Sequence, residues 1–194
     1  MDEDQLFVDG VFSDQQIGKA LVIGANQGEG PAYSLIEKGW YAVCCEPDPY
    51  ALGILLKNKY ADQLTIVHSA ITPTPGKLTP FYLAERTAMS SLQKDWLDLQ
   101  VDRNVCPKEE AVQKEILTNT ISFQELLDYV GTDFNLVVID AEGVDSELLG
   151  SIDWNQLPQC RMVCVEDLGD GGHCLEVAGF KFLHKSEHNF YYIR

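Results

Sequence analysis

The sequence has few basic residues, no long apolar run and no basic leader. Only 14 Lys and Arg accompany 30 Asp and Glu, which gives a formal net charge of −16. Because nucleic acids and anionic membranes are bound through Lys and Arg, we expect neither as a partner. No apolar run approaches the roughly 20 residues that span a bilayer, and the start, Met1-Asp2-Glu3-Asp4, is acidic. These absences predict a soluble, cytoplasmic protein.

The six cysteines form no CxxC pair, so the sequence favours neither a zinc site nor a disulfide framework. Most of them lie in or beside apolar runs, where a free thiol behaves as a small hydrophobic group. We therefore predict reduced, structural thiols. With 194 residues the chain is long enough for one domain, residues 1–194, with a full core. No feature of the sequence indicates the oligomeric state.

Residues 20–48 have the pattern around which the chain is organised. An apolar run at 20–23 is followed by glycines at Gly24, Gly28 and Gly30 and by a helix-compatible stretch from about residue 31 to 38. A second apolar run then ends at Glu46. Strand, glycine turn, helix, strand and acid is the first unit of a nucleotide-binding α/β domain. A carboxylate at that strand end can accept hydrogen bonds from both hydroxyls of a ribose.

Helices and strands alternate through most of the remaining sequence. Residues 1–19 are expected to be a lead-in, a strand or helix that covers a sheet edge. The other predicted elements are a helix capped by Asp48 to about residue 60, a strand at 64–68, a helix opened by a Ser122–Glu125 capping box and ended by Gly131, strands at 134–139 and 161–165, a helix capped by Asp145 through Leu149, a helix at 175–178, and an antiparallel pair at 180–184 and 190–193.

Residues 72–119 interrupt this alternation. Pro73, Pro75, Gly76 and Pro80 mark turns, a strand is expected at 81–83, and the part around 108–116 is expected to be helical. Residues 86–119 show no clear strand periodicity. Long excursions of this kind in a compact domain are often lids or substrate loops. We therefore treat 72–119 as an insertion that is a candidate for either.

Near-continuous apolar strands that alternate with helices predict an α/β fold with a mostly parallel, seven-stranded sheet, an antiparallel C-terminal strand pair and helices on both faces. Ligands of such sheets bind beyond the carboxyl ends of the strands. In this sequence those ends are Gly24, Glu46, Ser69, Asp140 and Glu166.

Two ribose-bearing cofactors fit the glycine turn. Its GxxxGxG spacing occurs in short-chain NAD(P)-dependent oxidoreductases and equally suits S-adenosylmethionine methyltransferases. An oxidoreductase of that type needs a Tyr-x-x-x-Lys pair, and no tyrosine here has Lys four positions later; Tyr129, for example, is followed by Asp133. Glu29 would also place a carboxylate against the cofactor phosphates. The oxidoreductase is therefore the alternative, and the methyltransferase the leading interpretation.

Several ordered stretches make the second interpretation specific. The sequence resembles the FkbM family of S-adenosylmethionine-dependent methyltransferases from about residue 20 to the end. The stretches that carry the resemblance are Ile23-Gly24-Ala25-Asn26-Gln27-Gly28, Cys45-Glu46-Pro47-Asp48-Pro49, Ser69-Ala70-Ile71, Ser90-Ser91-Leu92, Thr120 to Leu126, Val138-Ile139-Asp140-Ala141-Glu142-Gly143-Val144-Asp145, Gly179-Phe180 and Asn189-Phe190-Tyr191-Tyr192.

The resemblance implies a single-domain class I, Rossmann-like methyltransferase that uses S-adenosylmethionine, with methyl transfer to an oxygen of a sugar-like or other small polar acceptor. One position departs from the family pattern, because the acid that usually stands two residues before Gly24 is Val22 here. That acid commonly orients the amino-acid end of the cofactor. Its loss keeps open a third interpretation, a protein that binds the cofactor without catalysis.

The resemblance and the fold together assign roles to individual residues. Those at the methionine end of the cofactor are Gly24, Ala25, Asn26 and Gly28. Glu46 would accept from the ribose hydroxyls, and the residues around the adenine would be Pro47, Asp48, Ser69 and Ala70. Asp140 and Glu142 are the catalytic candidates: Asp140 would orient the cofactor ammonium group, and Glu142 would bind the acceptor or make structural hydrogen bonds.

Four acids at the strand ends, Asp140, Glu142, Glu166 and Asp167, could in principle bind Mg²⁺ or Ca²⁺ through their oxygens. Acidic strand ends that hydrogen-bond backbone amides are the commoner arrangement. No metal site is therefore assigned.

Overall fold

The structure is a computed structural model that describes residues 3–28 and 30–194. Met1, Asp2 and Glu29 lie outside the described residues. Among them is the carboxylate of Glu29, which would lie against the phosphates of an oxidoreductase cofactor.

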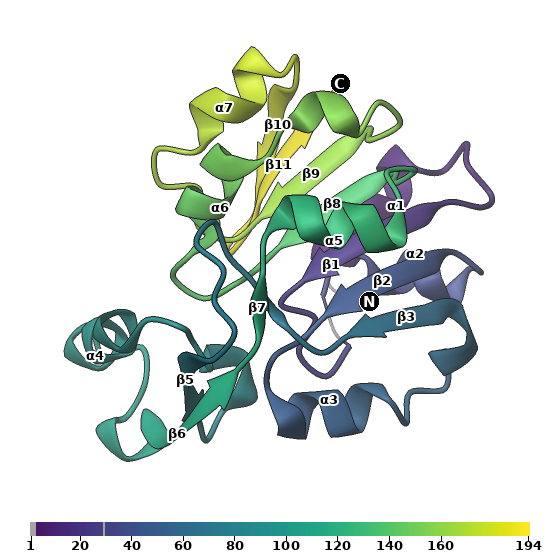
Figure 1. The fold of residues 1–194 in the computed structure, drawn as a ribbon. Coiled ribbons are helices and arrows are strands. Elements are labelled where there is room, and N and C mark those ends of the chain that lie inside the picture. Colours follow the sequence, from purple (N-terminus) through teal and green to yellow (C-terminus); the bar gives the residue numbers. More distant parts are fainter. Residues whose placement is uncertain (1–2, 29) are drawn as a thin grey trace.

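A seven-stranded sheet with the order β10-β11-β9-β8-β1-β2-β3 forms the centre of the molecule (Figure 1). The five strands from β9 to β3 in this order are parallel, and β11 is antiparallel to both β9 and β10. This confirms the predicted sheet and its C-terminal antiparallel pair. The strands are β1 (Lys19–Ile23), β2 (Tyr41–Cys45), β3 (Leu64–Val67), β8 (Leu136–Ile139), β9 (Met162–Val165), β10 (Lys181–Lys185) and β11 (Phe190–Ile193).

Helices cover both faces of this sheet, as predicted. Side chains alternate along each strand, so Ala20 and Val22 pack with one set of helices and Leu21 and Ile23 with the other. The first set is α1 (Glu3–Val11), α2 (Tyr33–Glu37) and α3 (Pro49–Leu55); the second is α5 (Phe123–Val130), α6 (Asp145–Ser151) and α7 (Gly172–Val177).

Local capping explains where these helices begin and end. Ser122 and Glu125 form the predicted capping box at α5, and the Asp48 side chain accepts from the amides of Tyr50 and Ala51 at the start of α3. That helix ends at Leu55, earlier than predicted, and an Asn58 side chain that accepts from the Tyr60 amide turns the chain away. The predicted cap at Asp145 is wrong: Val144 is the N-cap residue, and the Asp145 carboxylate accepts from the Ala141 amide instead.

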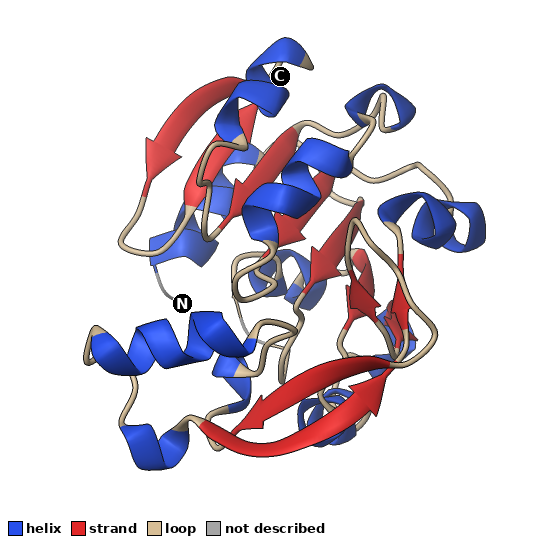
Figure 2. Ribbon diagram, turned by 60° about the vertical axis from the view of Figure 1, so that its left-hand side comes forward, coloured by secondary structure: helices blue, strands red, loops and turns tan. Residues whose placement is uncertain are grey.

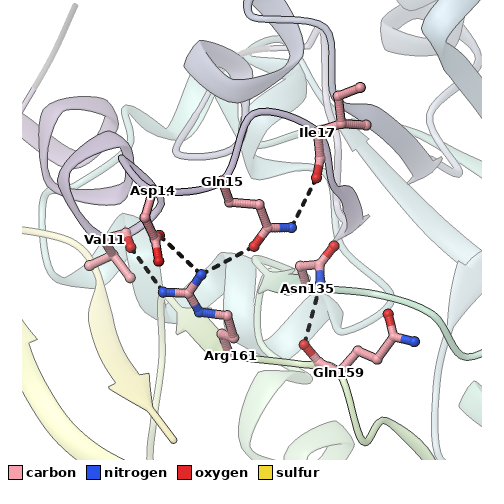
Figure 3. Close-up of polar contacts among 7 residues, drawn as sticks. All are labelled: Val11, Asp14, Gln15, Ile17, Asn135, Gln159 and Arg161. Carbon is pink, nitrogen blue, oxygen red and sulfur yellow. Dashed lines mark hydrogen bonds and ion pairs between the residues drawn. The ribbon is translucent and has the colours of Figure 1, made fainter.

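The lead-in is a helix joined to the sheet at its amino-terminal edge (Figure 3). Arg161, just before β9, donates to the side chains of Asp14 and Gln15 and to the carbonyl of Val11. These contacts tie the loop after α1 to the edge opposite the ends that carry Glu46 and Asp140. The loop after α1 therefore contributes to the framework, whereas the start of α1 lies beside the glycine turn, where the Gln5 side chain donates to the carbonyl of Gly30.

The excursion in the middle of the chain forms a separate small unit, here called the cap, residues 79–118. Its strands β5 (Thr79–Ala84) and β6 (Val112–Thr118) are antiparallel, with α4 (Lys94–Asp102) and two short 3₁₀ turns, η2 (Thr87–Met89) and η3 (Lys108–Glu110), between them. Figures 1 and 2 show this hairpin and α4 beside one end of the large sheet. A parallel pair of two-residue strands, β4 (Ala70–Ile71) and β7 (Thr120–Ile121), joins the cap to the sheet.

The predicted strand at 81–83 is therefore confirmed and extended, whereas the helix predicted around 108–116 is wrong. Most of that segment is the strand β6, which pairs Ile116 with Phe81 of β5. The cap also has a small core of its own, made by Ala84, Met89, Leu97, Cys106 and Ala111.

None of the helices among residues 3–28 and 30–194 is long and apolar enough to cross a membrane. All six cysteines are free thiols, and all but Cys174 are buried. This agrees with the predicted structural thiols.

Candidate functional site

An open cavity, whose about 580 Å³ of empty space includes solvent at its mouth, lies where β1, β2 and β8 end, between the sheet and the cap. This is the edge at which parallel α/β sheets bind ligands. Segments that are distant in the sequence form its walls. The lining residues include Gly24, Asn26, Glu46, Pro47, Ser69, Ala70, Asp140 and Glu142 from the sheet ends, and Phe81, Thr87, Ala88, Ser90 and Leu92 from the cap.

The turn after β1 requires glycine at position 24. Gly24 has a φ of 77°, and a Cβ there would lie 1.6 Å from the carbonyl oxygen of Asp140. A side chain would therefore push apart the ends of β1 and β8. Asn26 follows in the left-handed region with a φ of 44°, a conformation that asparagine tolerates better than most residues. This turn directs the Asn26 amide toward Glu46.

Glu46 is buried, with 5% of its surface exposed, and two backbone amides hold its carboxylate. The amide of Asn26 donates to Oε2 at 2.6 Å, and the amide of Asp48 donates to Oε1 at 2.7 Å. Burial raises the pKa of Glu46 to about 7, although these two hydrogen bonds lower it. Each carboxylate oxygen keeps a further lone pair for a hydroxyl donor. The residue is therefore placed to accept from a vicinal diol.

Three of the predicted cofactor residues do not line this cavity. Ala25 packs into the core beneath α1 and α2. Gly28 lies against Tyr33, since a Cβ there would meet the tyrosine hydroxyl at 1.9 Å. Asp48 is buried and caps α3, while its second oxygen accepts from the hydroxyl of Ser90 at 2.8 Å. These residues shape the loops that bear the lining residues, and direct contact with a ligand stays a prediction for them.

Acidic side chains gather at the other end of the cavity. Asp140, Glu142 and Glu166 each offer a carboxylate oxygen, and these oxygens lie within 4.8 Å of one another; Asp167 is not part of this group. Burial, and then the adjacent carboxylates, raise the pKa of Glu142 to about 10 and that of Asp140 well above its usual range. Oxygens at this spacing suit shared protons as well as a hard divalent cation. A bound proton or cation would therefore reduce the repulsion among these carboxyl groups.

The backbone at Glu142 is unusual as well. Glu142 has a φ of 47° and Gly143 a φ of 96°, so two successive residues are left-handed. A non-glycine residue in this region costs about 1–3 kcal/mol and persists only when its surroundings hold it. Such strain concentrates at functional sites.

The cap binds to three of the loops around the cavity. The hydroxyl of Thr87 donates to the Asn26 side chain at 2.7 Å, Ser90 donates to Asp48, and the hydroxyl of Ser91 donates to the carbonyl of Glu142 at 2.6 Å. Sequence reasoning did not place Thr87 or the two serines in the site. The two serines belong to Ser90-Ser91-Leu92, one of the stretches that resemble the family. Thr87 lies outside every such stretch.

Val22, the position of the departure from the family pattern, is buried in the core under α1 and α2 and does not line the cavity. Valine at position 22 therefore does not change the set of residues that form the cavity wall.

The sheet order, the glycine turn at β1 and the ribose-type acid after β2 define a class I, Rossmann-like methyltransferase fold. The chain matches the model described as the methyltransferase FkbM domain over residues 23–188. It therefore belongs to the FkbM methyltransferase family, and its cofactor is S-adenosylmethionine. This assignment sets aside the oxidoreductase alternative.

Solved structures with similar folds include a precorrin-6y C5,15-methyltransferase from Geobacter metallireducens GS-15, with a TM-score of 0.51 and 15% identity over 97% of this chain and 85% of that one. A conserved hypothetical protein of Streptococcus pyogenes has a TM-score of 0.50 and 13% identity over 96% and 94%. The METTL16 methyltransferase domain has a TM-score of 0.50 and 13% identity over 97% and 64%. At such identities the likeness shows the fold alone. No curated protein matches the chain.

The cavity fits this cofactor in one further respect. Oδ1 of Asp140 is buried and has no hydrogen-bond partner among the described residues. The ammonium group of the cofactor carries donors that such an oxygen lacks. Glu46 and Asp140 thus offer acceptors that could meet a ribose diol and an ammonium group.

Proposed function

We propose that the chain transfers a methyl group from S-adenosylmethionine to an oxygen atom of a sugar-like or other small polar acceptor. The bound cofactor supplies a methyl group on a positively charged sulfur, so the reaction is a displacement that needs an aligned acceptor and a place for the acceptor proton. Glu142 is proposed to act on the acceptor, and Asp140 is proposed to orient the cofactor.

The observation that carries this proposal is the contrast in acidity along one cavity. Glu46 lies at one end with a pKa of about 7, whereas Glu142 lies at the other with a pKa of about 10. A carboxyl group that stays protonated at neutral pH can donate a hydrogen bond to an acceptor hydroxyl. If the positive charge of the bound cofactor lowers the pKa of this carboxyl group so that it releases its own proton to solvent, the resulting carboxylate can take up the acceptor hydroxyl's proton as the oxygen–methyl bond forms and the sulfur–methyl bond breaks.

Asp140 has a different proposed role. Its buried, unpartnered Oδ1 would accept from the cofactor ammonium group and so fix the direction of the transferable methyl. The remaining proposed contacts are Gly24, Ala25, Asn26 and Gly28 at the methionine end and Pro47, Asp48, Ser69 and Ala70 around the adenine. The proposed domain is the whole of residues 1–194, with the cap inside it as the lid or substrate-binding element.

The net charge of −16 favours a small acceptor over a nucleic acid, because a polyanion would be repelled by the surface. Location in the cytoplasm stays a prediction from the sequence.

Titration calorimetry with S-adenosylmethionine and, separately, NADPH tests the cofactor. We expect a binding signal from the first and none from the second. Radiolabelled methyl transfer is then measured against parallel panels of sugars, small hydroxylated compounds, RNA and protein. Labelling of a small hydroxylated compound that is lost in Glu142→Ala supports the proposal. Labelling confined to RNA or protein, or binding with no transfer to any panel, would overturn it, and the last result would favour a protein that binds the cofactor without catalysis.

A further inference from the structure

Glu142 lies in a turn that is closed locally by the Asp145 carboxylate, which accepts from the Ala141 amide at 2.6 Å. It follows β8 and precedes α6, and neither element includes it. Its φ of 47° is followed by the φ of 96° at Gly143, so the chain makes two left-handed steps where the side chain must reach Asp140 and Glu166. The Ala141–Asp145 bond spans Glu142 without contacting its own peptide or side chain, and contacts from elsewhere add to it.

Those contacts come from the cap. The hydroxyl of Ser91 donates to the carbonyl oxygen of Glu142 at 2.6 Å, and Ser91 is only 1% exposed. On α4, Trp96 packs against the next residue, since a Cβ at Gly143 would lie 2.7 Å from Cγ of its indole. Ser91 thus holds the peptide of Glu142, and Trp96 covers Gly143.

Ser91 is itself held in place by the cap backbone. Its amide donates to the carbonyl of Tyr82, and the Tyr82 amide donates back to its carbonyl, which ties it to β5. Its hydroxyl also accepts from the Gln93 amide at 2.9 Å, an arrangement that directs the hydroxyl proton toward Glu142. The donor is therefore fixed in position before any ligand binds.

We propose that Ser91 is a positioning residue for methyl transfer: through its bond to the Glu142 carbonyl it sets the left-handed turn that holds the Glu142 carboxyl group beside Asp140 and Glu166. This rests on the proposed function, in which Glu142 faces the acceptor. Ser91 acts through Glu142, and together with Trp96 it joins the turn to the cap.

The adjacent serine provides a matched contrast. The Ser90 hydroxyl lies at the opposite end of the cavity, where it donates to the buried Asp48 beside Glu46. Two neighbouring residues of one segment thus contact the two ends of the site. Removal of either hydroxyl disturbs the cap to a similar degree, but only the loss of Ser91 should release Glu142.

The test uses the full chain saturated with S-adenosylhomocysteine and labelled with ¹³C at glutamate carboxyl groups. The variants are Ser91→Ala, Ser90→Ala and, as a distant control, Ser151→Ala, which removes a similar hydroxyl-to-carbonyl bond from α6. The Glu142 signal is assigned by its loss in Glu142→Gln. We measure its shift and its titration between pH 5 and 11, the amide hydrogen exchange at Glu142, and the Kd for S-adenosylhomocysteine.

In Ser91→Ala we expect the Glu142 titration to fall by about one pH unit or more, since the carboxyl group can leave the acidic cluster. Amide exchange at Glu142 should rise about tenfold or more, while the Kd for S-adenosylhomocysteine stays within about twofold. Ser90→Ala should weaken binding and leave the Glu142 signal unchanged, and Ser151→Ala should alter neither.

A Glu142 signal in Ser91→Ala that titrates and exchanges as in the wild type would overturn the proposal. If the alanine variant does not fold, Ser91→Cys, which has the same shape with a slightly larger atom and a weaker donor, must show the same changes at smaller size. These readouts need no acceptor. Failure of the proposed function would appear instead as absent cofactor binding or absent methyl transfer in the wild type, so the two failures are distinguishable.

Discussion

Glu46 and Glu142 are both glutamates that follow a sheet strand and face one cavity, but their carboxyl groups are held differently. Two backbone amides donate to Glu46, and among the described residues no amide bonds the carboxyl group of Glu142, which lies among other acids. Burial raises the pKa of both; the amides limit the rise at Glu46 to about 7, whereas adjacent carboxylates extend it to about 10 at Glu142. Backbone donors at Glu46 and adjacent carboxylates at Glu142 therefore together separate the pKa values of the two acids.

Removal of the first acid should give the largest effect on ligand binding. In Glu46→Ala the ribose hydroxyls lose their acceptor, and each charge-assisted hydrogen bond contributes about 1.5–3 kcal/mol. We expect the Kd for S-adenosylhomocysteine, measured by calorimetry, to rise by about 100-fold. Glu147→Ala, a change at an exposed position on α6, is the matched control and should bind as the wild type. An unchanged affinity in Glu46→Ala would mean that the cofactor does not use this end of the cavity.

Removal of the second acid should affect stability, with a sign that depends on pH. Because the folded-state pKa of Glu142 is raised to about 10, the folded protein keeps a proton that the unfolded chain loses above its ordinary pKa near 4. The stability of the wild type therefore falls as pH rises from about 4 to about 10, and this contribution disappears in Glu142→Gln. In the absence of cofactor we expect the variant to be close to the wild type at pH 5 and more stable at pH 8 by up to about 4 kcal/mol, since each pH unit in this range contributes about 1.4 kcal/mol.

Thermal and denaturant unfolding from pH 5 to 9 measure this difference. Glu147→Gln makes the same chemical change at an exposed site and should run parallel to the wild type. Parallel curves for Glu142→Gln as well would show that its carboxyl group is not buried among like charges in solution.

The acids at the ends of the strands could be found from the sequence. Glu46 follows directly from the apolar run that ends there, and that run is the strand β2 in the structure. Asp140 was equally visible at the end of β8. Both depend on local pattern, which strands buried on both faces express clearly.

The cap was harder to predict, because its structure depends on contacts between distant residues. β6 lies mostly at the surface and gains its strand conformation by pairing with β5, so its residues carry little alternation of their own. Thr87 reaches Asn26 across 61 positions of sequence, and Ser91 reaches Glu142 across 51. These contacts depend on how the cap packs on the sheet, and the local composition of either segment does not indicate them.

A smaller effect should appear in the pH dependence of binding. At a folded-state pKa of about 7, Glu46 is protonated in part at neutral pH, and its protonated form is a poorer acceptor for the ribose hydroxyls and the two amides. Affinity for S-adenosylhomocysteine should therefore rise with pH between about 6 and 8, at most about tenfold per unit on the acid side. Calorimetry across this range measures the slope.

Glu46→Gln separates the two ends of the cavity in the same measurement. Glutamine keeps an acceptor but does not titrate, so the part of the slope that belongs to Glu46 should vanish. Any slope that remains must come from the acidic cluster, since the ligand ammonium group would favour an ionised Asp140 over a protonated one. Adding Asp140→Asn to Glu46→Gln should then flatten the profile. A profile that keeps its full slope in the double variant would contradict the assignment of both ends, because neither acid would be titrating against the ligand.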